Sequence, residues 1–360
     1  MIKHTLILIL LILSLIGCGD AGGPSDAFDR TMMLTDVADK AIIPRYAGMQ
    51  EASEQLVAAV EAWTQSPSEP TLQAARKAWI DAAEAWQYAQ LFTFGPADGV
   101  TGTLSENINT FPTSVSKIES AIAAGDTTLL NFDRDARGLP ALDYLLFSAD
   151  GSASAEALKS SAIRGAYTRA VARDVLIQVD RVHGAWLGGY REAFIARNGS
   201  DAGSGATQMF NAFNRAFELL KNYKIGIPAG LQAGQTTPSP TSVEAPYSEQ
   251  SWRLAQVHMK ALEMFWYGNA MNGASFTSLR SYIAARGGAS LEASTREQFN
   301  AIDRASALVP SDVSLSALCA AEDQSVKTYY VELQKLTRFI KSETSSLLGL
   351  SITYASGDGD

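Results

Sequence analysis

Histidine and cysteine, the side chains most often used to bind transition metals or to attack substrates, are both scarce in this chain of 360 residues. His183 follows Asp180 by one helical turn, a spacing that places two potential metal ligands on one face of a helix. A first-row metal needs three or four such ligands. We therefore interpret His183 as a histidine held by the carboxylate of Asp180, and His258 offers no better set of neighbours.

Motifs for several large enzyme classes are absent from the sequence, which has no glycine-rich phosphate loop, no H-E-x-x-H, no paired-cysteine metal spacing and no G-x-S-x-G. Cys319, one of two cysteines, lies in the apolar-rich segment 315–321, which predicts a buried thiol and not a nucleophile. The formal net charge is −9 and the basic residues are scattered, so we expect no nucleic-acid partner.

Cys18 predicts a different chemistry, the attachment of lipid. It follows Lys3 and the apolar run Leu6–Leu13, and it closes the tetrapeptide Leu15-Ile16-Gly17-Cys18. A positive start, an apolar middle and a small-residue exit are typical of a secretory signal peptide. The tetrapeptide resembles the lipobox of bacterial lipoproteins, which implies a signal peptide over residues 1–17 and acylation of Cys18. An ordinary secreted protein with a chance cysteine is the alternative.

A lipidated Cys18 implies a membrane partner and a place in the bacterial cell envelope, facing the periplasm. Gly19 stands where aspartate often marks retention in the inner membrane, so the outer membrane is the expected location. Residues 18–30 are mostly small and polar, which predicts a flexible tether. Loss of Lys3 with the signal peptide changes the formal charge from −9 to −10. Because an acidic surface disfavours adhesion to anionic lipid, the acyl chains are the expected membrane contact.

Apolar residues recur at helical spacing from about Met32 onward, which predicts an all-α protein. Its length suggests two antiparallel helical bundles packed together, over residues 31–200 and 201–360. A glycine pair at 188–189 is expected to break or bend the longest helix, and residues 225–246 are expected to form a long loop. The predicted helices are 34–65 (bent at Pro44), 71–92, 115–124, 154–197, 203–223, 248–270, 275–286, 290–308 and 314–348.

Several separate segments resemble signatures of the imelysin-like family, also called the insulin-cleaving membrane protease family. They are Arg76–Pro96, Gly138–Phe147, Lys224–Pro228 with Val243–Ser248, and Leu347–Asp360. The resemblance implies an exported, all-helical, two-domain protein with its functional site in the cleft between the domains. Members of this family are associated with bacterial iron acquisition, and some were first classed as metallopeptidases.

The resemblance breaks down at the family's G-x-H-x-x-E motif. Gly138 is kept, but Pro140 stands where the histidine belongs and Asp143 where the glutamate belongs. Gln90 also stands where relatives often carry glutamate. Because proline has no lone pair to offer a metal, we expect no catalytic residue, no metal ligand and no resident cofactor. Asp143 has two possible roles that remain open: capping the start of its own helix, or binding a ligand.

The residues in the matching segments that carry polar or aromatic groups, or that belong to the motif, are the candidate ligand-binding set. They are Trp79, Gln90, Gly138, Pro140, Asp143, Lys224, Glu244 and Ser248. Trp79 and Trp86 also fit a packed apolar stripe together with Ala75, Ala82 and Ala89.

The expected function is therefore a non-catalytic, lipid-anchored envelope protein that binds iron or another ligand, with iron-uptake components of the envelope as possible partners. A metallopeptidase is one alternative. The other is a protein-interaction module that uses exposed aromatic residues, namely Trp252, Trp266, Tyr267, Tyr329 and Tyr330, although residues of this kind at helical spacing more often belong to the core.

Overall fold

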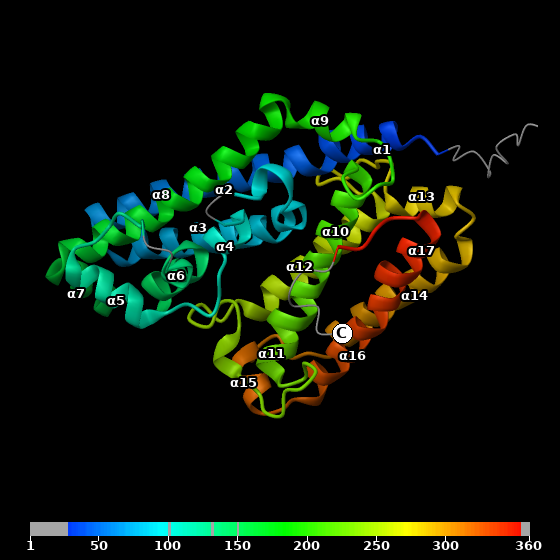
Figure 1. The fold of residues 1–360 in the computed structure, drawn as a ribbon. Helices are drawn as coiled ribbons and strands as arrows, with labels where there is room; N and C mark the ends of the chain where they lie inside the picture. The colour runs from blue at the N-terminus through cyan, green and yellow to red at the C-terminus, as the bar shows by residue number, and fades with distance from the viewer. Residues whose placement is uncertain (1–27, 100–101, 131–132, 150, 354–360) are drawn as a thin grey trace, which may run out of the picture.

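Regular structure in the described part of the chain is helical, apart from one isolated antiparallel bridge between Asn269 and Ser275 (Figure 1). The computed structural model describes residues 28–99, 102–130, 133–149 and 151–353. The helices of these residues confirm the predicted all-α fold. The expected signal peptide, Cys18 and most of the tether lie outside the described residues, and none of the helices described is both long and apolar enough to cross a membrane.

The first helical rod combines α1 (Arg30–Val37), a π-helical turn η1 (Ala38–Ile42) and α2 (Ile43–Gln65). Pro44 lies in the first turn of α2, where its missing N–H costs little. The rod ends at Gln65, as Pro67 predicts. α3 (Glu69–Ala89) begins at a capping box built on Ser68 and continues into η2 (Gln90–Phe92). Its alanine–tryptophan stripe is buried against neighbouring helices, so this stripe is core.

Short helices connect α3 to the next long helix. They are η3 (Gly95–Ala97), α4 (Leu104–Ile108), α5 (Val115–Ala124), η4 (Arg134–Ala136), α6 (Gly138–Phe147) and α7 (Gly151–Ser160). α5 has the predicted bounds. α6 carries the altered motif and packs against α3 and α8.

The predicted helix 154–197 is not one helix. Ser161 leaves helical geometry and caps α8 (Ala162–Ala185), which separates α8 from α7. After α8 come η5 (Trp186–Tyr190) and α9 (Arg191–Ala196), and the non-helical angles of Gly188 and Gly189 bend the chain between them, as predicted. α8 packs along α2, whereas α9 contacts α1 and α10, so the bend directs the chain toward the second half.

The second half begins with α10 (Gly205–Glu218), η6 (Leu219–Gly226) and α11 (Ile227–Ala229), so the predicted loop starts about five residues later than expected. After a loop with one turn, η7 (Pro240–Ser242), come α12 (Ser251–Tyr267), α13 (Leu279–Ala285) and α14 (Ala289–Ser306). The predicted helix 314–348 is divided into α15 (Leu315–Ala320), α16 (Gln324–Thr337), η8 (Arg338–Glu343) and α17 (Thr344–Leu348). Glu322, with a left-handed φ of 51°, turns the chain between α15 and α16.

The structure places several side chains whose roles were considered from the sequence. The aromatic residues considered for protein docking are core: Trp252, Trp266, Tyr329 and Tyr330 are buried and Tyr267 is half-buried. His183 is not held by Asp180, because its Nδ1 lies 2.6 Å from Oε1 of Gln50 on α2. Cys319 is buried as predicted, and burial raises the pKa of its thiol to about 12.

Candidate functional site

A buried ion pair between Lys224 and Glu244 forms the centre of the site. Lys224 lies on η6 and Glu244 on the loop that leads to α12, and their side chains are 1% and 3% exposed. The Lys224 ammonium nitrogen lies 2.9 Å from Glu244 Oε1 and 2.8 Å from Oε2. Only the bond to Oε1 has hydrogen-bond geometry, so Oε2 takes part through charge alone.

Amide side chains from the first half complete this pair. Gln87 on α3 accepts a hydrogen bond from Lys224 Nζ at 2.5 Å, and it donates to Glu244 Oε1 at 3.2 Å. Asn109, just after α4, donates to the same carboxylate oxygen at 2.8 Å. Gln90 donates to Gln87. The five side chains therefore form one network that connects α3 and the end of α4 to η6 and the following loop.

The network lies in a low-dielectric environment. Burial lowers the pKa of Lys224, and the nearby carboxylate of Glu244 opposes that effect. His258 on α12 is fully buried, and neither ring nitrogen has a hydrogen-bond partner among the described residues. Burial lowers the pKa of His258 well below its usual value, and the charge of Lys224 lowers it further. His258 is therefore neutral at pH 7.

The altered motif forms the start of α6 and packs tightly against α4. Gly138 has a φ of +77°, and a Cβ at this position would lie 2.5 Å from the carbonyl oxygen of Ile108. Only glycine satisfies both conditions. Pro140 is buried within the first turn of α6, where its ring preserves helical geometry.

Asp143 connects α6 to the loop before α12. Its Oδ2 accepts the backbone N–H of Tyr247 at 3.0 Å, and its Oδ1 accepts that of Ser248 at 3.0 Å. Tyr144 packs edge-on against Tyr247 beside this contact, at 5.2 Å between ring centroids. The carboxylate thus caps donors of a distant loop and not the start of its own helix. Burial raises the pKa of Asp143 to about 6, although these hydrogen bonds oppose the shift.

The residues at this site do not fit the metal centre that the resemblance implies. Pro140 has no donor atom, and both oxygens of Asp143 already accept backbone hydrogen bonds. The other anionic group, Glu244, is paired with an ammonium. Among the described residues, no group of three or more His, Cys, Asp or Glu side chains is arranged to hold a metal ion.

The structure separates the eight candidate residues into three groups. Gln90, Lys224 and Glu244 belong to the network. Asp143 and Ser248 form a second contact, between α6 and the loop that carries Glu244. Trp79, Gly138 and Pro140 serve packing: Trp79 is buried and its Nε1 donates to the carbonyl of Leu139 at 2.9 Å. The network and the Asp143 contact form a closed seam between the halves of the chain, and all eight candidates are buried or half-buried.

Two network members, Gln87 and Asn109, are absent from the candidate set. Gln87 left a signal in the sequence, because it is a polar residue one turn after Ala83 on the buried face of α3. Asn109 left none. Arg45 on α2 was also missed: it is 2% exposed, lies over the rings of Tyr88, Phe92 and Phe265, and has no hydrogen-bond partner among the described residues.

Known proteins with similar sequences or structures support the all-α fold and show to which family the chain belongs. Over 144 residues the chain is 28% identical to iron-regulated protein A of Synechococcus elongatus, and the match covers 37% of this chain and 38% of that relative. The chain thus matches well under half the length of this curated relative. Two crystal structures share the fold.

One of them, described as an iron-regulated protein A precursor from Parabacteroides distasonis, has a TM-score of 0.73 and 18% identity, and covers 89% of this chain and 95% of its own. The other, an imelysin-like protein from Psychrobacter arcticum, has a TM-score of 0.72 and 20% identity, and covers 90% of this chain and 97% of its own. The family model of imelysin matches residues 42–339, and this chain belongs to the imelysin family.

Proposed function

We propose that this protein is a non-catalytic imelysin of the bacterial cell envelope, anchored by lipid at Cys18 and facing the periplasm, that takes part in iron uptake as a binding or accessory component. The names of its relatives support the link to iron, because one is an iron-regulated protein A and a structural neighbour is described as its precursor. The lipobox-like tetrapeptide before Cys18 supports the anchor.

The observation that carries the non-catalytic role is the position of Asp143. In the family motif this residue stands for a metal ligand, but here both of its oxygens accept backbone hydrogen bonds from Tyr247 and Ser248. A metallopeptidase needs a firm ligand set with one open position. The altered motif supplies a structural contact between α6 and the loop before α12 in place of that set.

Two measurements on the purified soluble protein test this role. Peptide cleavage should be absent, with or without added zinc. Calorimetric titration with ferric iron, ferrous iron, copper and haem should show binding of at least one of these. Chelator-sensitive cleavage that Asp143→Ala abolishes would overturn the non-catalytic role. Uniformly silent titrations would count against direct binding and leave only an accessory role.

The anchor is tested separately by Cys18→Ser and fractionation of the cells. The wild type should sediment with the outer membrane, and the variant should be released or remain as an unprocessed precursor. A Cys18→Ser protein that is still processed and wholly membrane-bound would contradict lipid anchoring. The interaction-module alternative has lost its motivation, because four of the aromatic residues considered for it are buried.

A further inference from the structure

The structure places the start of the described chain against the second half of the protein. Phe28 stacks on Tyr282 of α13, with 4.5 Å between ring centroids. Arg30, the first residue of α1, donates a hydrogen bond to the hydroxyl of Tyr282 at 3.1 Å. The segment that leads back to Cys18 therefore joins the protein at the end where α1 lies beside α13 (Figure 1).

The number of residues between Cys18 and Phe28 limits which part of the protein can lie near the membrane. Ten residue steps separate the two positions, and they span at most about 36 Å. The rod of α1, η1 and α2, residues 30–65, leads away from Phe28 over roughly 54 Å. With lipid at Cys18, the end that carries α1 and α13 is therefore held near the membrane, whereas the opposite end of the rod is beyond the reach of this segment.

Two exposed methionines lie at the same end. Met32 is 53% exposed, and it shares a face of α1 with Asp36, one helical turn further on. Oδ2 of Asp36 accepts the backbone N–H of Thr277 at 2.9 Å, which joins this face to the turn that follows α12. An antiparallel bridge closes that turn, residues 269–275, and Met271 within it is 50% exposed. Neighbouring elements therefore present both apolar side chains to the outside.

The surface around these methionines differs in charge from the rest of the protein. The chain has 38 acidic residues, but residues 264–291, which include the turn and α13, contain none and contain two arginines. One of these, Arg286, is exposed at the end of α13. The carboxylates at the border are engaged, since Asp29 caps the start of α1 and Glu292 pairs with Arg280 at 2.8 Å. This end thus presents little negative charge to a lipid surface.

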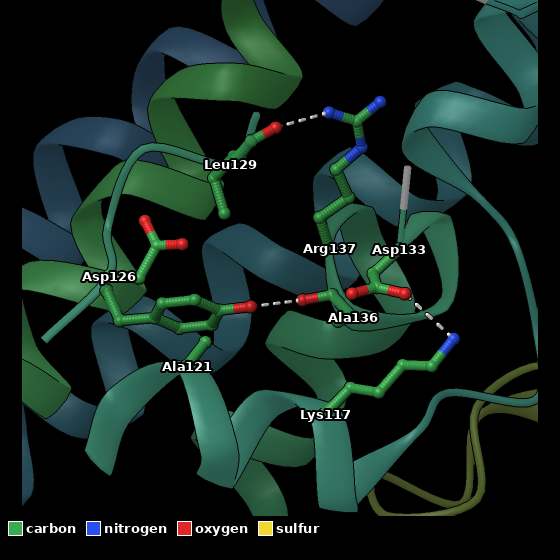
Figure 2. A pocket seen from close by; sticks show the side chains of 8 residues that line it. Lys117, Ala121, Asp126, Leu129, Asp133, Ala136 and Arg137 are labelled. Carbon is green, nitrogen blue, oxygen red and sulfur yellow. Dashed lines mark hydrogen bonds and ion pairs between the residues drawn. The ribbon is translucent and has the colours of Figure 1, made fainter. Parts of the chain in front are cut away.

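Other faces of the protein are less suited to lipid. The exposed carboxylates of Glu51 and Glu54 lie along α2. At the opposite end, Figure 2 shows Asp126 and Asp133 at the recess beside α5, where Asp133 pairs with Lys117 at 3.0 Å. Ionised side chains lose their hydration at a cost when they enter an apolar layer. These faces therefore favour water over the bilayer.

We propose that Met32, the turn 269–275 and α13 form a membrane-facing surface, which lies on the headgroup layer of the phospholipid bilayer that holds the acyl chains. This inference depends on the proposed lipid anchor at Cys18. The two methionines enter the boundary between head groups and acyl chains, where their flexible side chains adapt to a fluid surface. The rod of α1, η1 and α2 then extends away from the membrane.

The size of the apolar patch favours lipid over a second protein. Among the described residues of α1, the turn and α13, the exposed large apolar side chains are Met32 and Met271. A stable protein interface buries about 800 Å² on each partner around an apolar centre, which two methionines do not supply. A lipid surface needs only shallow insertion, because the acyl chains already provide the anchoring.

A fluorescent label on the lipidated, full-length protein tests the membrane-facing surface. Met271→Cys can be labelled alone with NBD, because Cys319 is buried and the thiol of Cys18 carries lipid in the proposed mature protein. In vesicles of phosphatidylcholine and phosphatidylglycerol, the NBD emission should shift to shorter wavelength and lose most of its intensity to nitroxide-bearing lipids. The matched control is Leu308→Cys, which is 65% exposed just after the far end of α14 and should show neither change.

Flotation of the same samples separates this inference from the anchor. A protein that floats with the vesicles but shows equal quenching at positions 271 and 308 overturns the membrane-facing surface and leaves the anchor standing. A protein that does not float overturns the anchor, and the surface with it. A label at 271 that is shielded in proportion to protein concentration, and not quenched by nitroxide-bearing lipids, indicates a second copy and also overturns the proposal.

A charge placed on the surface provides a second readout. With the label at Met32→Cys, the added substitution Met271→Asp should reduce quenching by nitroxide-bearing lipids, because a carboxylate resists entry into the apolar boundary. The matched control, Leu308→Asp, should leave the quenching unchanged. Far-UV circular dichroism checks that both variants keep their helices. Equal quenching with Met271→Asp and Leu308→Asp in folded, floating protein overturns the assignment.

Discussion

Replacing Lys224 with methionine tests how much the buried ion pair, at the centre of the network between the two halves of the chain, contributes to stability. The substitution keeps most of the side-chain volume but leaves Glu244, which is 3% exposed, with two neutral amide donors in place of a cation. Removing one partner of a buried pair costs about 3–5 kcal/mol, because the remaining charge is no longer compensated. We expect Lys224→Met to lower the free energy of unfolding by that amount at neutral pH.

The matched control is Lys77→Met on α3. Lys77 pairs with Asp81 on the surface, where its side chain is 75% exposed. Such a pair contributes about 0.5 kcal/mol or less. Urea unfolding followed by far-UV circular dichroism measures both variants, and the difference between them isolates the effect of burial.

The double variant Lys224→Met/Glu244→Gln completes a thermodynamic cycle. Glutamine can still accept the hydrogen bonds from Gln87 and Asn109, but it carries no charge to be stranded. Each single variant should therefore be less stable than the double variant, with a coupling energy of about 2 kcal/mol or more. The reasoning is refuted if Lys224→Met matches Lys77→Met within about 0.5 kcal/mol, or if the two substitutions are additive.

Three further predictions concern the same region. The pKa of Asp143 is about 6 in the folded protein and 3.8 in the reference state. Its contribution to the free energy of unfolding is therefore fully present below pH 3.8 and is lost as the pH rises through 6, by about 3 kcal/mol in total. Urea titrations between pH 4.5 and 7.5 should show this loss in the wild type but not in Asp143→Asn. Arg45→Met should be neutral or should stabilise the fold by about 1 kcal/mol, since it removes a buried charge with no hydrogen-bond partner in the described chain. Arg45→Ala should instead destabilise the fold, because packing around the side chain is lost. Thermal denaturation compares the two variants. Gly138→Ala should cost more than about 2 kcal/mol, because alanine would meet the Ile108 carbonyl at a positive φ, and its unfolding midpoint in urea measures this.

Local patterns predicted the helices well where one signal dominated. The bounds of α5 follow from its apolar spacing and from Gly125, which ends it in left-handed geometry. The bend after α8 follows from Gly188 and Gly189. The breaks at Ser161 and Glu322 were not predicted, because neither residue type excludes a helix.

The candidate site was predicted in part for a comparable reason. Lys224 and Glu244 lie in the segments that resemble family signatures, and the structure brings them together. Their partners Gln87 and Asn109 are distant in sequence by more than a hundred residues, and no local pattern identifies which amides reach a buried carboxylate. The predicted partner of His183 was wrong for the same reason, since its Nδ1 lies within hydrogen-bond distance of Gln50 on a neighbouring helix.

The altered motif and the closed seam are both incompatible with a metal site at these residues. A metal site needs ligands with free lone pairs and some access for substrate. Here the carboxylate of Asp143 is fixed by two backbone donors, and Glu244 is fixed by an ammonium and two amides. Apart from the ion pair with Lys224 on η6, each contact joins an element of the first half to the loop before α12. Both carboxylates therefore stabilise the contacts of that loop with the rest of the chain.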